Sequence, residues 1–257
     1  MSSASARATT GFARYPSLVG QTAFVTGGAT GLGAEFVRQL AAQDVRVCFV
    51  DIDESAGRDL AAEVDGWFAP CDVRDIPSLT ETIAAAAEAR GPITVLVNNA
   101  ADDRRSNWRE LDEQLWDDRI AVNLRHQFFA ARAVAPMMKA AGHGSIINLG
   151  SISAHIDLVD LVGYITAKAG VEGLTRTLAR ELGPDGIRVN CIIPGWIMTE
   201  RQLRDWVTPE AEAAIARNQC LPQKLYPDDV ARMMLWLAAE DSQSCTAQNW
   251  VVDGGWM

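Results

Sequence analysis

Seven short apolar runs alternate with longer segments of helical periodicity along this chain of 257 residues. The apolar runs predict buried strands, which cover residues 22–26, 45–51, 67–71, 94–98, 145–150, 187–193 and 248–254. The segments between them predict helices over residues 31–43, 55–64, 76–89, 119–141, 162–181 and 228–240. Regular alternation of strand and helix predicts an α/β fold, a doubly wound parallel sheet of about seven strands with helices on both faces.

No linker rich in Pro, Gly or Ser interrupts this alternation, so residues 18–257 are expected to form a single domain. Residues 1–17, rich in Ser, Ala, Thr and Arg, are expected to form a disordered tail. A longer excursion at about residues 195–222 follows the sixth predicted strand. Ligands of doubly wound sheets bind beyond the carboxyl ends of the strands, so this excursion is expected to be a substrate loop.

Charge and cysteine usage narrow the function. The formal net charge of −10 disfavours nucleic acid and anionic membranes as partners, because both would repel the chain. No apolar run is long enough to span a bilayer, and the first residues lack the apolar core of a secretory signal. The five cysteines are widely spaced and mostly lie in apolar runs, which indicates buried thiols, a reducing cytoplasmic setting and no metal site.

The strongest nucleotide signal is TGGATGLG, which joins the first strand to the first helix. Gly27 allows a tight turn, Gly31 lets the backbone approach a phosphate, and Gly33 permits close helix packing. Asp51 ends the second strand, where an acid can accept hydrogen bonds from both ribose hydroxyls. A 2′-phosphate at about 4 Å from that acid would cost roughly 4 kcal/mol, so NAD is favoured over NADP. Taken alone, Asp51 is equally consistent with a solvated acid.

Tyr164 and Lys168 are four residues apart on one predicted helix, so they share a helix face. A neighbouring ammonium favours the phenolate and lowers a phenol pKa that is ordinarily about 10. Ser151 stands at the end of the fifth apolar strand. The three residues together indicate proton-transfer chemistry, although a Tyr-x-x-x-Lys pair alone also occurs by chance.

These motifs, with Asp72-Val73, Asn98-Asn99-Ala100, Asn123 and Pro194-Gly195, occur in the order and spacing of the short-chain dehydrogenase/reductase family. The chain therefore resembles that family from about Leu18 to its C-terminus, and the resemblance implies a Rossmann fold. The family usually has glycine where this chain has Ala101. Alanine is harmless there if its φ is negative.

The resemblance implies a role for each matching residue. Tyr164 would be the general base, Lys168 would hold the nicotinamide ribose, Ser151 would orient the reacting oxygen, and Asn123 would anchor a water. The implied NAD-binding residues are Gly27, Thr30, Gly31, Leu32, Gly33, Asp51, Ile52, Asp72, Val73, Asn99, Ala100, Tyr164, Lys168, Pro194, Gly195, Ile197 and Thr199. The family commonly forms homotetramers through the helices that carry Asn123 and Tyr164.

Longer sequence segments, including GSISAH and QCLPQ, resemble those of the bacterial aldose 1-dehydrogenases, among them the D-xylose 1-dehydrogenases. That branch uses NAD to oxidise the anomeric C1 hydroxyl of a sugar to a lactone. The implied substrate residues are Ser151, Ser153, His155, Tyr164 and Trp196. Asp102, Asp103, Asn107 and Gln202 could also bind hydroxyls, although an acidic pair beside Arg104 and Arg105 is more typical of a solvated loop.

Several alternatives remain open at this stage. His155 fits either a substrate ligand or a loop histidine with a structural hydrogen bond, and Trp196 could simply pack beneath the loop. The substrate could instead be a polyol, a hydroxysteroid or a 3-oxoacyl compound. The chain could also be a non-catalytic nucleotide-binding scaffold.

Overall fold

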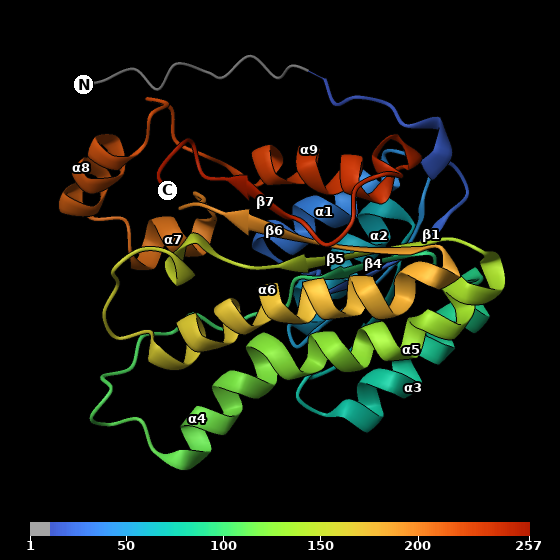
Figure 1. Cartoon of the computed structure of the whole chain (residues 1–257), viewed down its shortest axis with the longest axis horizontal. Helices are drawn as coiled ribbons and strands as arrows, with labels where there is room; N and C mark the ends of the chain where they lie inside the picture. Colours follow the sequence, from blue (N-terminus) through green and yellow to red (C-terminus); the bar gives the residue numbers. More distant parts are fainter. Residues whose placement is uncertain (1–10) are drawn as a thin grey trace.

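A computed structural model describes residues 11–257, in which one parallel sheet forms the centre of the molecule (Figure 1). Its strand order is β3-β2-β1-β4-β5-β6-β7. The strands are β1 (Thr22–Thr26), β2 (Arg46–Asp51), β3 (Trp67–Pro70), β4 (Val95–Asn98), β5 (Gly144–Leu149), β6 (Ile187–Pro194) and β7 (Asn249–Val252). The predicted doubly wound parallel sheet is confirmed, and each strand lies within two residues of its predicted bounds.

Helices cover both faces of the sheet (Figure 1). One layer consists of α1 (Gly31–Ala41), α2 (Glu54–Val64) and α9 (Pro227–Ala238). The other consists of α3 (Ile76–Arg90), α5 (His126–Ala141) and α6 (Val162–Leu182). Successive strand residues point to opposite faces, so Ala23 and Val25 join the core beneath α1 while Phe24 joins the core beneath α3 and α5.

Helix starts account for two differences from the sequence prediction. The helix expected from residue 119 begins earlier, as α4 (Glu113–Ile120), because the Asp112 side chain accepts a hydrogen bond from Leu115 N at its start. It then passes through a π-helical segment, Ala121–Arg125, before α5. The expected substrate loop contains α7 (Glu200–Asp205) and α8 (Pro209–Asn218), whose starts are capped by Thr199 and Thr208.

Residues 1–10 of the predicted tail lie outside the described residues, whereas residues 11–17 contact the domain. Tyr15 N donates to Gln43 Oε1 at 3.0 Å, and Gln43 Nε2 donates to Ala13 O at 2.8 Å. The Phe12 and Tyr15 side chains pack, partly buried, against the core beneath α1. This short segment therefore adds packing and hydrogen bonds to one end of the sheet layer.

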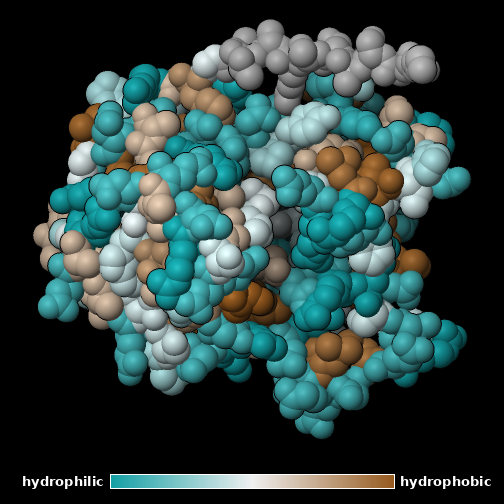
Figure 2. Space-filling view, turned by 180° about the vertical axis from the view of Figure 1, so that it is seen from behind, coloured by the Kyte–Doolittle hydropathy of each residue, from teal (hydrophilic) through white to brown (hydrophobic). Residues whose placement is uncertain are grey.

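The surface agrees with the acidic composition. The face seen in Figure 2 is mostly hydrophilic, with hydrophobic residues in small separate patches. None of the helices within residues 11–257 is long and apolar enough to cross a membrane.

Among the cysteines, Cys48, Cys71 and Cys191 are buried as expected, but Cys220 is exposed and Cys245 is half-buried, because both lie outside the apolar strands.

Candidate active site

The predicted site residues gather at one edge of the sheet, where the carboxyl ends of parallel strands meet. The glycine turn follows β1, Asp51 ends β2, Asp72 and Val73 follow β3, and Asn99 and Ala100 follow β4. Ser151 follows β5, and the segment from Pro194 to Thr199 leaves β6. Six strands thus contribute to one site, although their residues are scattered over most of the sequence.

Glycine is required in the turn after β1 for reasons that the contacts make clear. Gly27 has φ +64°, and a Cβ there would lie 2.7 Å from Ala100 Cα. A Cβ at Gly33 would lie 1.9 Å from the carbonyl oxygen of Gly27, so this residue lets α1 begin directly against the turn. Gly31 has φ +57°, and a Cβ there would approach the Thr199 side chain to 3.6 Å. A narrow cradle therefore runs between the start of α1 and the segment after β6.

Two polar side chains form hydrogen bonds with the backbone in and next to the glycine turn. Asp51 Oδ2 accepts a hydrogen bond from Ala29 N at 2.9 Å, so the acid at the end of β2 lies against the glycine turn. Asn99 Nδ2 donates to Thr26 O at 3.1 Å and to Gly27 O at 2.7 Å. Free N–H groups at the start of α1, whose first residues follow Thr30, face the same region and suit a phosphate.

The remaining predicted cofactor residues vary in exposure. Val73, Ala100 and Ile197 are buried, whereas Ile52 is 77% exposed beside Asp51. Asp72 accepts hydrogen bonds from the Arg74 backbone and guanidinium, which lowers the pKa of its carboxyl. Its carboxylate is thus occupied by Arg74, and contact with an adenine ring stays a prediction for this residue.

Ser151, Tyr164 and Lys168 come together as the sequence predicts. Lys168 is fully buried on α6, and its Nζ donates to Leu149 O at 2.7 Å. The same Nζ lies 5.5 Å from the centroid of the Tyr164 ring. Ser151 lowers the pKa of the Tyr164 phenol, and its Oγ accepts a hydrogen bond from Ser153 Oγ at 2.9 Å.

The electrostatics of Tyr164 differ from the sequence prediction. Burial raises the pKa of the phenol, the Asp103 carboxylate raises it further, and Ser151 and Arg201 lower it. Burial also lowers the pKa of Lys168 to about 8. Desolvation disfavours the charged form of each group, and the expected lowering of the Tyr164 pKa by the Lys168 ammonium is not seen in this structure.

Asn123 is held tightly in the π-helical segment. Its Oδ1 accepts from Asp102 N at 2.9 Å, while its Nδ2 donates to Asp102 O and to Arg119 O, both at 3.0 Å. Both amide hydrogens are therefore used, and the side chain clamps the backbone of the loop after β4. A water held by this residue stays a prediction, since one lone pair of the Oδ1 atom is all that its amide has left.

The predicted sugar ligands fall into two groups. Ser153 lies in the site through its hydrogen bond to Ser151. The His155 ring instead pairs with Glu172 on α6 at 2.6 Å, and Glu172 also accepts from Asn249 Nδ2 at 2.5 Å. Of the two alternatives for His155, the structure shows the structural hydrogen bond.

Trp196 directly follows Gly195, and its ring stacks on Trp256 with centroids 6.4 Å apart. Its indole N–H is buried and has no hydrogen-bond partner among the described residues.

The described residues contain no group of three or more His, Cys, Asp or Glu arranged to hold a metal. Ala101 is not among the described residues with positive φ, so alanine fits where a glycine is usual.

Comparison with known proteins connects this site to a family. The family model described as enoyl-(acyl carrier protein) reductase matches residues 27–257. The D-xylose 1-dehydrogenase of Caulobacter vibrioides is 47% identical over 247 residues, which cover 94% of this chain and 98% of that protein. The chain belongs to the short-chain dehydrogenase/reductase family. The family interpretation made from the sequence motifs is confirmed.

Two other members of the family extend the comparison. A protein of Rhizobium meliloti described as "probable galactose dehydrogenase" is 42% identical over 248 residues, covering 94% of this chain and 97% of its own length. A solved 7 alpha-hydroxysteroid dehydrogenase, complexed with NADH and 7-oxo glycochenodeoxycholic acid, superposes with a TM-score of 0.89. It is 27% identical and covers 95% of this chain and 96% of its own. The family and this NADH complex together indicate a nicotinamide cofactor.

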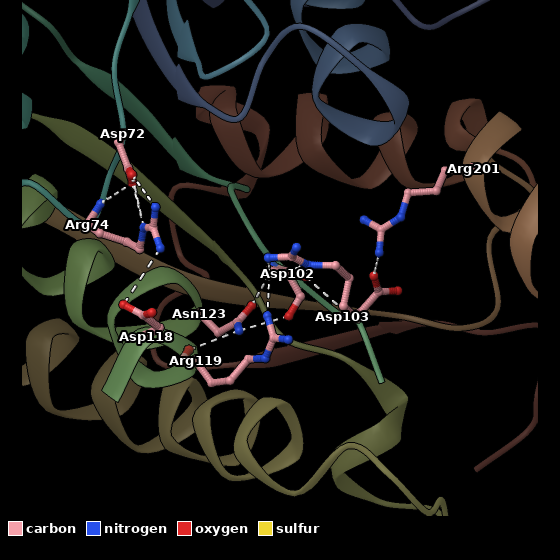
Figure 3. A network of polar contacts seen from close by, with 9 residues as sticks. Asp72, Arg74, Asp102, Asp103, Asp118, Arg119, Asn123 and Arg201 are labelled. Carbon is pink, nitrogen blue, oxygen red and sulfur yellow. Dashed lines mark hydrogen bonds and ion pairs between the residues drawn. The ribbon is translucent and has the colours of Figure 1, made fainter. Parts of the chain in front are cut away.

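This short-chain dehydrogenase/reductase also has site residues that sequence reasoning missed. Arg119 is buried and pairs with Asp102, and Arg201 at the start of α7 pairs with Asp103 (Figure 3). Both arginines approach an aspartate from a distant part of the chain. Local spacing could not reveal these pairs, because 17 and 98 residues separate the partners.

Proposed function

We propose that this chain catalyses the NAD-dependent oxidation of the anomeric C1 hydroxyl of an aldose, a pentose or a hexose, to the aldonolactone. The observation that carries the proposal is full-length similarity to a D-xylose 1-dehydrogenase at 47% identity, with Ser151, Tyr164 and Lys168 assembled at the site. The galactose dehydrogenase relative supports the same substrate class.

The residues present fit a dinucleotide. The cradle between Gly31 and Thr199 is narrow enough that one added Cβ would begin to fill it, and the start of α1 offers backbone N–H groups. Asp51 would hold the adenosine ribose, and Lys168 the nicotinamide ribose. The bound nicotinamide would accept the hydride from C1 of the sugar.

The protein's own residues manage the proton. Ser151 donates a hydrogen bond that orients the C1 oxygen, and Tyr164 takes the proton from that oxygen as C1 is oxidised. Lys168 lies at 5.5 Å from the Tyr164 ring and favours the phenolate once it is charged. Because burial raises the pKa of Tyr164, sugar oxidation is expected to accelerate as the pH rises above neutral.

Asp51 supports NAD rather than NADP as the cofactor. Its carboxylate lies against the glycine turn, where a 2′-phosphate at about 4 Å would be repelled by roughly 4 kcal/mol at an effective dielectric near 20. We expect Asp51→Asn to reduce the preference for NAD over NADP by about ten- to a hundredfold in kcat/KM.

Asp53→Asn is the matched control for this change, since Asp53 caps α2 two residues away and asparagine preserves the cap. Its NAD preference should equal that of the parent protein. An unchanged NAD preference in Asp51→Asn would show that the acid at the end of β2 does not bind the adenosine ribose.

The substrate class is tested by initial rates with NAD on D-xylose, L-arabinose, D-galactose and L-fucose at equal concentration, beside a polyol and a hydroxysteroid. Turnover of at least one sugar, above the polyol and the steroid, supports the proposal. Turnover of the polyol or the steroid alone would show that the substrate belongs to another chemical class. Binding of NADH without turnover of any compound would indicate a scaffold.

We also propose that the enzyme is a homotetramer assembled through α5 and α6. Phe128 on α5 and Val162 on α6 are 38% and 42% exposed in the single chain, which leaves apolar surface on both helices. Light scattering should give four times the mass of the chain, and Phe128→Glu should lower that mass. A monomer at micromolar concentration would contradict this assembly.

A further inference from the structure

Two loops from non-adjacent strands meet in front of Tyr164. The loop after β4 carries Asp102 and Asp103, and the segment after β6 carries α7. β5 lies between those two strands in the sheet, so the loops must cross the carboxyl end of β5, which leads to Ser151. Figure 3 shows the Arg201 side chain directed at Asp103, with which it forms an ion pair.

Asp103 makes the contacts that join the loops. Its Oδ1 forms an ion pair with Arg201, and its Oδ2 accepts from Gln202 Nε2 at 2.8 Å. A third contact lies further along both segments, where the Arg105 guanidinium stacks 4.8 Å from the centroid of the Trp206 ring. The side chains of Asp103 and Arg201 are 26% and 41% exposed, so the pair is partly shielded from solvent.

The loop that presents Asp103 is unusually well fixed. The neighbouring Asp102 has its backbone clamped by Asn123 and its carboxylate paired with buried Arg119 (Figure 3). Ser106 N donates to Asp160 O at 2.8 Å and ties the same loop to the start of α6. The loop after β4 therefore offers α7 a fixed point of attachment.

The pair also faces the reacting groups. The Asp103 carboxylate raises the pKa of Tyr164, and the Arg201 guanidinium lowers it. Ser151 from the end of β5 also lowers the pKa of this phenol, and Lys168 Nζ on the same helix lies 5.5 Å from the centroid of the ring. Asp103 and Arg201 therefore lie near enough to Tyr164 for their charges to act on its phenol.

We propose that Asp103 is a positioning residue, which holds α7 over Tyr164 through Arg201 and Gln202 and so confines the substrate beside the phenol. The part that concerns the substrate rests on the proposed sugar oxidation. The attachment of α7 does not depend on that reaction, because the three contacts lie within the protein itself.

The first test needs no substrate. Amide hydrogen exchange of residues 199–206 should accelerate by about three- to tenfold in both Asp103→Asn and Arg201→Gln, since each breaks the same contact. Arg204→Gln is the matched control, because Arg204 on the same helix pairs only locally, with Asp205. Exchange in this control should equal that of the parent.

The second test separates a positioning role from a merely structural one. Both variants should raise KM for the sugar by about three- to tenfold while changing kcat less. The pH at which oxidation reaches half its maximal rate should move in opposite directions, downward in Asp103→Asn and upward in Arg201→Gln. A loss of packing alone would move both variants the same way.

Each outcome has a definite meaning. Exchange of residues 199–206 that matches the parent in both variants would overturn the proposal, as would an unchanged KM on an active sugar. Shifts of the pH profile in the same direction would overturn it too. If no sugar is oxidised at all, the proposed substrate class fails, and the exchange measurement still decides whether Asp103 holds α7.

Discussion

At the scale of single residues, burial acts on Tyr164 and Lys168 in opposite directions. It raises the pKa of the phenol and lowers that of the ammonium to about 8, so both neutral forms are favoured. A nearby positive charge favours the phenolate, so an oxidised nicotinamide bound beside Tyr164 would lower the pKa of the phenol.

Tyr164→Phe should therefore remove turnover and preserve the site. Loss of the general base is expected to lower kcat by about a thousandfold, because positioned acid–base groups contribute roughly 10²- to 10⁴-fold. NADH affinity, measured by fluorescence titration, should change by less than about threefold because the phenyl ring still packs. Near-normal turnover in this variant would refute the assigned role.

Other single residues show where sequence reasoning stops. The Tyr164, Lys168 and Ser151 trio was predictable because its spacing and its place at a strand end both encode chemistry. The pairing of His155 with Glu172 was not, since nothing in the sequence places residue 155 beside the middle of α6. The Asp103 contact with Arg201 was equally hidden, because it depends on the path of α7.

At the scale of elements, the central strands β1, β4, β5 and β6 were predicted closely because they are buried on both faces and therefore almost continuously apolar. The short helices α7 and α8 were missed because their residues are mostly exposed and carry little apolar periodicity. Their Thr199 and Thr208 caps, with Pro209 in the first turn of α8, were the local signals present in the sequence. The π-helical segment around Asn123 lies inside one apolar pattern and has no such signal.

Close packing of α6 against α4 depends on Gly163. A Cβ there would lie 2.9 Å from Arg119 Cβ and 3.2 Å from Arg119 Cγ, atoms too near the backbone to move freely. Gly163→Ala should push the helices apart and reduce the free energy of unfolding by about 1–3 kcal/mol, measured by urea titration. Because Arg119 holds Asp102, the same change should also raise KM for the sugar.

Gly183→Ala, just after the end of the same helix, is the control for this prediction. Gly183 has φ −56°, and a Cβ there meets nothing within 4 Å. Alanine should leave the stability unchanged or increase it by up to about 1 kcal/mol through the unfolded state. Equal losses of stability in both variants would show that the contact with Arg119 is not the cause.

At the scale of the whole molecule, stability against acid depends on a histidine far from solvent. His126 is fully buried at the start of α5, and burial together with the Lys168 charge lowers its pKa from 6.5 to about 3. Between these two pH values the unfolded chain binds a proton that the folded chain does not. The folded state therefore loses free energy relative to the unfolded state as the pH falls below 6.5.

The size of this effect follows from the same shift. At pH 5.5, one unit below the ordinary value, protonation of His126 in the unfolded chain should cost about 1 kcal/mol of stability, compared with almost nothing at pH 7.5. In His126→Gln that component should vanish, so the loss between pH 7.5 and pH 5.5 should shrink by about 1 kcal/mol. Urea titrations at both pH values measure it.

Comparison across pH makes this prediction independent of any packing defect that the substitution introduces, because such a defect lowers stability equally at both pH values. His143→Gln supplies the control, since His143 is exposed and its replacement should leave the acid-induced loss as it is in the parent. If His126→Gln and the parent lost the same free energy on acidification, the buried histidine would have to accept its proton inside the folded domain. The carboxylates paired with arginine, such as Asp72 and Asp102, would then account for the whole acid response.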